Sequence, residues 1–132
     1  MQPKQKFPKI EKLKSNKDLE ELFAEGKSIY ENPIKAIYKL KTDKTKITIS
    51  ATVSVPKKIQ KLAVDRNLLK RRMREAYRLN NTPLKQTLIN NNTALNLIFI
   101  YNSKQIFDYH TIEDKIKVIL SRLNSMFKVG AE

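Results

Sequence analysis

Apolar and polar side chains alternate along two segments of this chain, residues 34–40 and residues 47–55. Side chains two positions apart share one face of a strand, so this pattern is typical of strands with one buried face. The apolar set of the second segment is Ile47, Ile49, Ala51, Val53 and Val55. A polar run, KTDKT, separates the two segments. The pattern therefore predicts an antiparallel hairpin.

Two segments before and after this hairpin show helical spacing instead. The first is expected to start at Ser15, which forms a possible capping box with Asp18, and to stop at Gly26. The second spans residues 62–79, where the switch to helical spacing follows Pro56. Its apolar stripe consists of Leu62, Leu69, Met73, Ala76 and Tyr77.

The last third of the chain predicts a short helix, a strand and a long helix. Thr82 and Pro83 suit the cap and first position of a helix that reaches residue 89. Residues 94–101 are apolar on both faces, which is typical of a central strand. Residues 111–127 form a continuous helical stripe, with Thr111 and Asp114 as a second possible capping box.

These elements predict one α+β domain, a small α-β sandwich over residues 15–132 with helices packed on a mainly antiparallel central sheet. Residues 1–14 are basic and Pro-containing, and we expect an arm that is either mobile or laid along the surface. The longest apolar run, ALNLIFIY, is far below the ~20 residues of a spanning helix. No secretory signal is visible either, so we expect a cytoplasmic protein without a membrane partner.

Charge gives the first indication of a partner. Lys and Arg number 27 against 13 Asp and Glu, a formal net charge of +14, which predicts a polyanionic ligand. The chain has no Cys, one His and two Gly. This composition argues against a zinc site, a thiolate nucleophile and the Gly-rich phosphate loops. We therefore expect no catalytic residue, metal site or cofactor on the protein itself.

The basic charge is concentrated in the helix at residues 62–79. Six Lys or Arg and a single acid, Glu75, lie between Arg66 and Arg78. At 100° per residue, a slowly drifting row forms from Arg66, Lys70, Arg74 and Arg78, with Asn67 and Arg71 beside it. Most charged runs are simply solvated faces, but those usually mix signs. Repulsion between like charges favours a bound nucleic acid here.

The segment SVPKKIQKLAVDRNLLKRRMREAYR resembles the signature of the bacterial ribonuclease P protein family, V-S-x-K-K followed by R-N-R-x-K-R-x-x-R-E. The matching positions are Val55, Lys57, Lys58, Arg66, Asn67, Lys70, Arg71, Arg74 and Glu75. The segment NKDLEELFAEGKS resembles the family's first helix. Three positions depart from the pattern: Leu68 replaces an Arg, Pro56 a Ser, and Leu19 an aromatic residue.

The resemblance implies a left-handed β-α-β crossover and an accessory role in an endoribonuclease. In such a ribonucleoprotein a catalytic RNA, with Mg²⁺, removes the 5′ leader of precursor tRNA. The RNA-binding residues that it implies are Lys57, Lys58, Arg66, Asn67, Lys70, Arg71, Arg74 and Arg78. It also implies a leader cleft between the first helix and the sheet, formed by Phe23, Ser28 and Tyr38. Lys70 and Arg74 would lie near the edge of that cleft.

Other interpretations predict similar chemistry. Phe23 and Tyr38 could be ordinary core residues, because apolar faces of helices and strands normally bury. A basic RNA-binding protein of ribosomal type would show the same charge and nearly the same fold. A DNA-binding protein would need a recognition helix with base-reading side chains, and we expect no DNA partner.

Overall fold

A computed structural model of the chain describes residues 16–41 and 48–129. The predicted arm, Ser15 and the polar turn before residue 48 lie outside this part. The elements follow the order α1 (Asn16–Glu25), β1 (Lys27–Glu31), β2 (Ile34–Leu40), β3 (Ile49–Ser54), α2 (Ala63–Asn80), α3 (Thr82–Asn90), β4 (Leu95–Tyr101) and α4 (Tyr109–Val129). None of the helices in the described part has the length and apolarity needed to cross a membrane.

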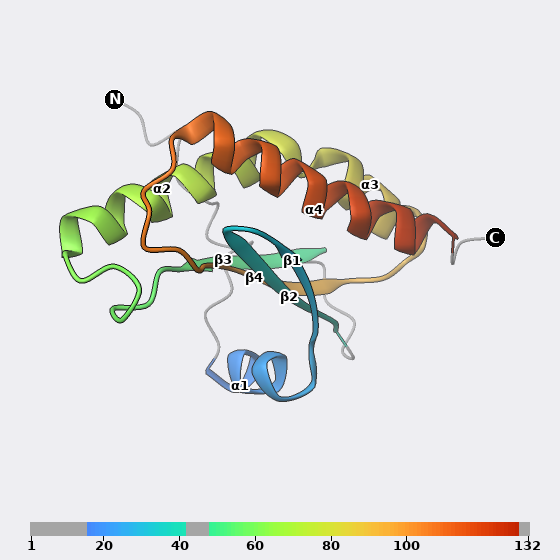
Figure 1. Ribbon diagram of the computed structural model, residues 1–132. Coiled ribbons are helices and arrows are strands. Elements are labelled where there is room, and N and C mark those ends of the chain that lie inside the picture. Colours follow the sequence, from blue (N-terminus) through green and yellow to red (C-terminus); the bar gives the residue numbers. More distant parts are fainter. Residues whose placement is uncertain (1–15, 42–47, 130–132) are drawn as a thin grey trace, which may run out of the picture.

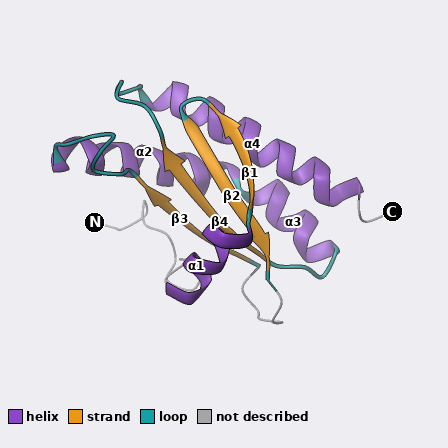
Figure 2. Ribbon diagram, turned by 60° about the horizontal axis from the view of Figure 1, so that its bottom comes forward, coloured by secondary structure: helices purple, strands orange, loops and turns teal. Residues whose placement is uncertain are grey.

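The four strands form one mixed sheet in the order β1-β2-β4-β3 (Figure 2). Strand β2 pairs antiparallel with β1 and with β4, while β3 pairs parallel with β4. The predicted hairpin between residues 34–40 and 47–55 is therefore wrong, because β4 lies between these two strands. The true hairpin partner of β2 is β1, a strand that the apolar pattern did not reveal. The turn between them contains a cis peptide bond at Asn32-Pro33.

Helices cover both faces of the sheet, with α1 on one side and the other three on the opposite side (Figure 1). The larger core lies under α2, α3 and α4. Its strand residues are Ile29, Ile34, Ala36, Ile49, Ala51, Val53, Leu95, Leu97, Phe99 and Tyr101. The smaller core joins Leu22 of α1 to Ile37 and Ile98. Strand β4 is thus buried on both faces, and its predicted central position is confirmed.

The connection from β3 to β4 runs through α2 and α3. Figure 2 looks at the sheet from the α1 side, with α2 behind it. When the parallel strands β3 and β4 are turned to run upward, β4 lies to the right of β3. The crossover is therefore left-handed, against the strong right-handed preference of such units and in agreement with the resemblance.

The observed helix ends agree with some of the predicted capping residues and differ from others. Helix α3 carries Pro83 in its first turn, as predicted. Helix α4 begins before the predicted Thr111, because Asp108 is the capping residue and its Oδ1 accepts a hydrogen bond from the Thr111 backbone N–H at 2.9 Å. This bond holds the pKa of Asp108 below its usual value. Leu62 is exposed, since it precedes α2 instead of packing beneath it.

Gly26 ends α1 at the predicted position. The atoms around it leave no room for a side chain. Its backbone N–H donates to the Leu22 carbonyl at 2.9 Å. A Cβ at Gly26 would lie 2.4 Å from that same oxygen and 2.7 Å from Cγ2 of Ile37. The absence of a side chain therefore lets α1 turn directly into β1 while Leu22 stays packed on the sheet.

We predict that Gly26→Ala lowers the free energy of unfolding by about 1–3 kcal/mol, the cost of forcing atoms into a packed site. Urea unfolding followed by circular dichroism measures the change. Ser28→Ala, at an exposed position two residues later, is the control and should change the stability by less than ~0.5 kcal/mol. Equal stability of both variants would show that the α1–β1 junction relaxes freely.

Candidate nucleic-acid interface

Helix α2 has one buried face and one basic flank. Leu69, Met73, Ala76 and Tyr77 are buried, and Lys70 and Arg74 each follow a buried residue by one position. Helix α2 packs against β3 and α4, whereas α4 also covers β1 and β2. Arg72, on the other flank, donates to the Phe107 carbonyl just before α4. The flank of α2 that carries Lys70 and Arg74 therefore faces away from α4. It points outward beyond β3, the strand at that edge of the sheet.

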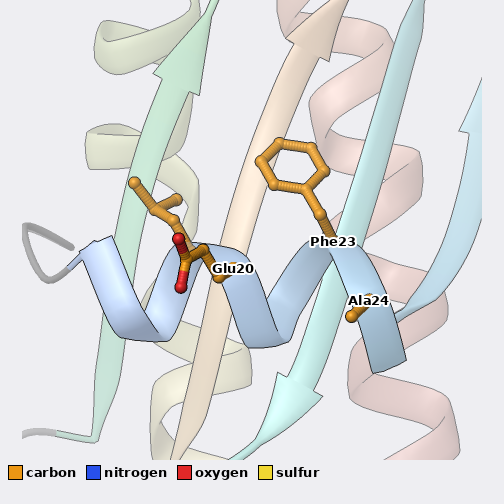
Figure 3. A pocket seen from close by; sticks show the side chains of 4 residues that line it. Glu20, Phe23 and Ala24 are labelled. Atoms are coloured by element: carbon orange, nitrogen blue, oxygen red, sulfur yellow. The ribbon is translucent and has the colours of Figure 1, made fainter.

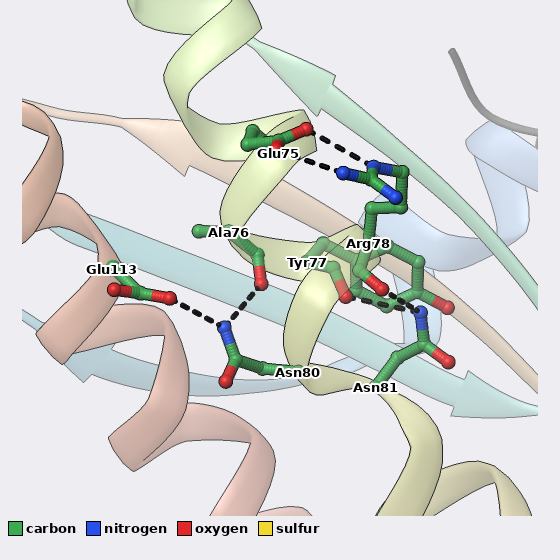
Figure 4. Close-up of polar contacts among 7 residues, drawn as sticks. All are labelled: Glu75, Ala76, Tyr77, Arg78, Asn80, Asn81 and Glu113. Carbon is green, nitrogen blue, oxygen red and sulfur yellow. Dashed lines mark hydrogen bonds and ion pairs between the residues drawn. The ribbon is translucent and has the colours of Figure 1, made fainter. Parts of the chain in front are cut away.

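Two of the predicted RNA-binding residues have side-chain partners within the protein. Arg66 donates from Nη1 to the carbonyls of Gln60 and Lys61, at 2.9 and 2.8 Å. Arg78 forms a two-point ion pair with Glu75, at 3.0 and 2.8 Å, and the hydrogen bond to Glu75 raises the pKa of Arg78 (Figure 4). These two side chains therefore help to hold α2 and the loop that precedes it in place.

The side chains of the remaining predicted cations make no hydrogen bond or ion pair within residues 16–41 and 48–129. They are Lys57, Lys58, Lys70, Arg71 and Arg74. Lys57, Lys58 and Arg71 are exposed, while Lys70 and Arg74 are half-buried. Asn67 lies exposed on the same side of α2. We define these six residues as the basic flank, whose five charged side chains are available to a polyanion.

Two asparagines anchor the end of α2 (Figure 4). Asn80 donates from Nδ2 to the Ala76 carbonyl at 2.7 Å and to Oε2 of Glu113 on α4 at 3.0 Å. The Asn80 hydrogen bond holds the pKa of Glu113 below its usual value. Asn81 donates to the Tyr77 carbonyl at 3.0 Å. The repelling charges thus lie on a helix that is fixed at its end.

The loop before α2 is also fixed, although Pro56 departs from the family pattern. The Pro56 carbonyl accepts hydrogen bonds from the backbone N–H groups of Ile59 and Gln60, at 3.0 and 3.1 Å. The buried Gln60 side chain donates to the carbonyls of Ser103 and Lys104, at 3.1 and 2.8 Å. The turn therefore holds Lys57 and Lys58 at the end of β3.

An open row of side chains crosses the α1 face of the sheet beside this loop. The register places Tyr30 opposite Lys35, Lys35 opposite Ile100, and Ile100 opposite Ser54. Helix α1 covers the next row, where Leu22 packs on Ile37 and Ile98. We call Tyr30, Lys35, Ile100 and Ser54 the open row; Tyr30 is exposed, the other three are half-buried, and Ile100 packs against the smaller core. It leads from the β1 edge to Lys57 and Lys58.

Phe23 borders this row from α1. Its side chain is 57% exposed and lines a hollow of about 560 Å³ with Leu19, Glu20 and Ala24. Figure 3 shows its ring extending from α1 in the direction in which β3 and β4 run. That direction leads to the open row, since Ser54 is the last residue of β3. Phe23 is therefore an exposed aromatic ring, not a core residue.

The structure separates Tyr38 from Phe23, contrary to the expected cleft. Neighbouring side chains on a strand point to opposite faces, and Ile37 packs under α1. Tyr38 therefore lies on the α4 side, with its ring centroid 6.4 Å from that of Phe127. Ser28, by contrast, is opposite Ile37 and lies on the α1 face, as expected.

Tyr30 occupies the position that Tyr38 was expected to fill. It is 51% exposed on the α1 face, and its hydroxyl donates to Oδ1 of Asn32 at 3.0 Å. The sequence analysis missed it because β1 was not predicted. The available signal was weak, a single buried Ile29 flanked by polar positions in KSIYE.

The comparisons with known proteins point to one family. The family model "Ribonuclease P" matches residues 7–124. The chain is 33% identical to the ribonuclease P protein component of Porphyromonas gingivalis over 115 residues, 87% of this chain and 84% of the relative. RNase P proteins of Staphylococcus aureus and Thermotoga maritima share the fold, each with a TM-score of 0.67. Their identities are 20% and 23%, and the matches cover 85% of this chain and 94% and 96% of theirs.

We predict that Arg66→Ala lowers the free energy of unfolding by about 1 kcal/mol, since two carbonyls lose a charged donor that solvent partly replaces. The double variant Lys70→Ala/Arg74→Ala should be unchanged or slightly more stable, because it removes like-charge repulsion. Thermal and urea unfolding measure both effects. A large loss in the double variant would mean that these two side chains are structural.

Proposed function

The chain belongs to the ribonuclease P protein family, and we propose that it binds the catalytic RNA of that enzyme and the 5′ leader of precursor tRNA. Membership makes it a component of an endoribonuclease complex with an RNA partner. In the proposal the protein acts in the cytoplasm and the RNA performs the cleavage with Mg²⁺. The described residues offer no group of three or more His, Asp or Glu that could hold that ion. In this proposal the protein's part is to bind and to orient the RNAs.

The observation that carries this proposal is the position of the basic flank beside the open row. Lys and Arg side chains without internal partners can exchange counterions for phosphates. Exposed rings offer stacking platforms that accept any base. Phe23 and Tyr30 provide rings, and the basic flank provides charge. Together they fit a single strand of nucleic acid that lies next to a structured RNA.

We assign the two parts separately. Arg71, Asn67 and the loop lysines, all exposed, face the catalytic RNA. The open row takes the leader, with Lys35 near its phosphates and Phe23 and Tyr30 against its bases. We place Lys70 and Arg74, on the flank of α2 that faces away from α4, between the two sites. This replaces Tyr38 by Tyr30 in the expected leader cleft.

Reconstitution with a bacterial ribonuclease P RNA tests the function. The protein should accelerate leader removal at low Mg²⁺, and the protein freed of RNA should not cleave at all. RNA affinity should fall steeply with salt, with a log–log slope of about −0.7 per engaged phosphate. A slope near zero, or binding to ribosomal RNA with equal affinity and no effect on cleavage, would contradict the proposal.

A series of leaders shortened one nucleotide at a time tests the open row. Phe23→Ala and Tyr30→Ala should each weaken binding of precursor tRNA by the holoenzyme by roughly 5- to 150-fold, from the loss of one stacking platform worth ~1–3 kcal/mol. Binding of mature tRNA should not change, because it has no leader. The variants should also become insensitive to shortening.

Tyr38→Phe is the matched control, because its ring lies on the other face of the sheet. It should respond to leader length as the wild type does. If the wild type, Phe23→Ala and Tyr30→Ala all lose affinity at the same leader lengths, the leader does not use the open row.

A further inference from the structure

A second hollow lies at the opposite end of the β1–β2 pair from the open row. It has a volume of about 350 Å³ and forms where the end of β2, the start of β1 and the ends of α1 and α4 meet. Ligand pockets commonly measure ~300–1,000 Å³, so this hollow has room for one small planar group. It is too small for a run of stacked bases.

The walls of this hollow are apolar and partly exposed. Tyr38 and Phe127 meet edge to face, with an angle of 88° between their rings. Leu40 is 44% exposed and Met126 is 42% exposed at the same place. The Tyr38 hydroxyl donates to the sulfur of Met126 at 3.4 Å, which fixes the ring. Apolar side chains that gather at one hollow indicate a binding site more strongly than scattered ones do.

The rim of the hollow carries positive charge. Lys27 is exposed, and Lys39 lies 3.6 Å from Glu25, the one acid of the lining. This pairing leaves the Lys27 ammonium as the uncompensated charge at the opening. An apolar, aromatic wall beside a cation fits a planar ring that carries an anionic group. A neutral apolar chain would leave the Lys27 ammonium without a counter-charge.

We propose that this hollow binds a single unstacked nucleobase of an RNA, with its phosphate at Lys27. The inference rests on the proposed function, which supplies an RNA partner, but it uses a different end of the sheet. A base turned out of its stack gains contact with Tyr38, Phe127 and Met126. The protein would then hold its RNA at two places, at opposite ends of the β1–β2 pair. The base can come from the catalytic RNA or from the precursor tRNA.

Methionine methyl groups report directly on this hollow. The chain has three methionines, and Met126 lines the hollow while Met73 is fully buried in the core. In the full chain labelled with ¹³C-methyl methionine, adenosine 5′-monophosphate should shift the Met126 signal in a saturable way. The Met73 signal should stay in place. Ribose 5-phosphate, which lacks the base, should give less than a tenth of the shift.

Leu40→Glu should weaken this binding at least tenfold, because it places an anion at the opening. Val118→Glu is the matched control, since Val118 is 41% exposed on α4 and does not line the hollow. It should bind as the wild type does. Phe23→Ala and Tyr30→Ala should also leave the Met126 shift unchanged, which separates this site from the leader site.

Three results would overturn the inference. They are an unmoved Met126 signal at millimolar nucleotide, an equal shift with ribose 5-phosphate, and a Met126 shift that follows protein concentration, which would indicate a second copy in the hollow. Failure of leader binding with an intact Met126 response would contradict the proposed function alone. Displacement of the nucleotide by a leader oligonucleotide assigns the base to precursor tRNA. If only the catalytic RNA displaces the nucleotide, the bound base belongs to the catalytic RNA.

Discussion

The burial of β4 on both faces is the constraint on which the rest of the structure depends. A strand with apolar side chains on both sides needs cover from two layers and a neighbour on each edge. Helix α1 provides one layer through Leu22, and α2 and α4 provide the other. Because β4 has a neighbour on each edge, it lies between β2 and β3. Strands β3 and β4 are parallel, so the chain between them must cross over the sheet through a long connection, which contains α2.

The two layers differ in extent, and this difference creates the candidate site. Helix α1 has 10 residues, whereas α2 and α4 have 18 and 21. The short helix buries one cross-sheet row and leaves the next one open, with Phe23 at its border. The long helix α2 ends its packing at the β3 edge, so one flank faces solvent beside that open row. The incomplete layer therefore leaves aromatic rings exposed on the α1 face, while the basic flank faces solvent at the β3 edge.

The cations on and around α2 divide into two groups with different physical roles. Arg66, Arg72 and Arg78 donate to carbonyl or carboxylate oxygens within the protein. They hold the helix and the loops around it. Lys70, Arg71 and Arg74 have no such partners among the described residues and repel one another. The first group gives the rigidity that keeps the second group close together in the absence of a ligand.

The sequence by itself determined the helices, the central position of β4 and the basic row of α2. These are local features, because helical period, a proline at a first turn and an apolar run are visible within one segment. The motif around Arg66 and Lys70 also identified the family. Only the tertiary structure decided the strand partners, the face on which Tyr38 lies and the place of Tyr30. Alternation shows which side chains share a face, but not which layer covers that face or which strand lies alongside. Those choices depend on contacts between residues far apart in the chain, so Tyr38 and Tyr30 could be assigned to their surfaces only after β1 and β4 were in place.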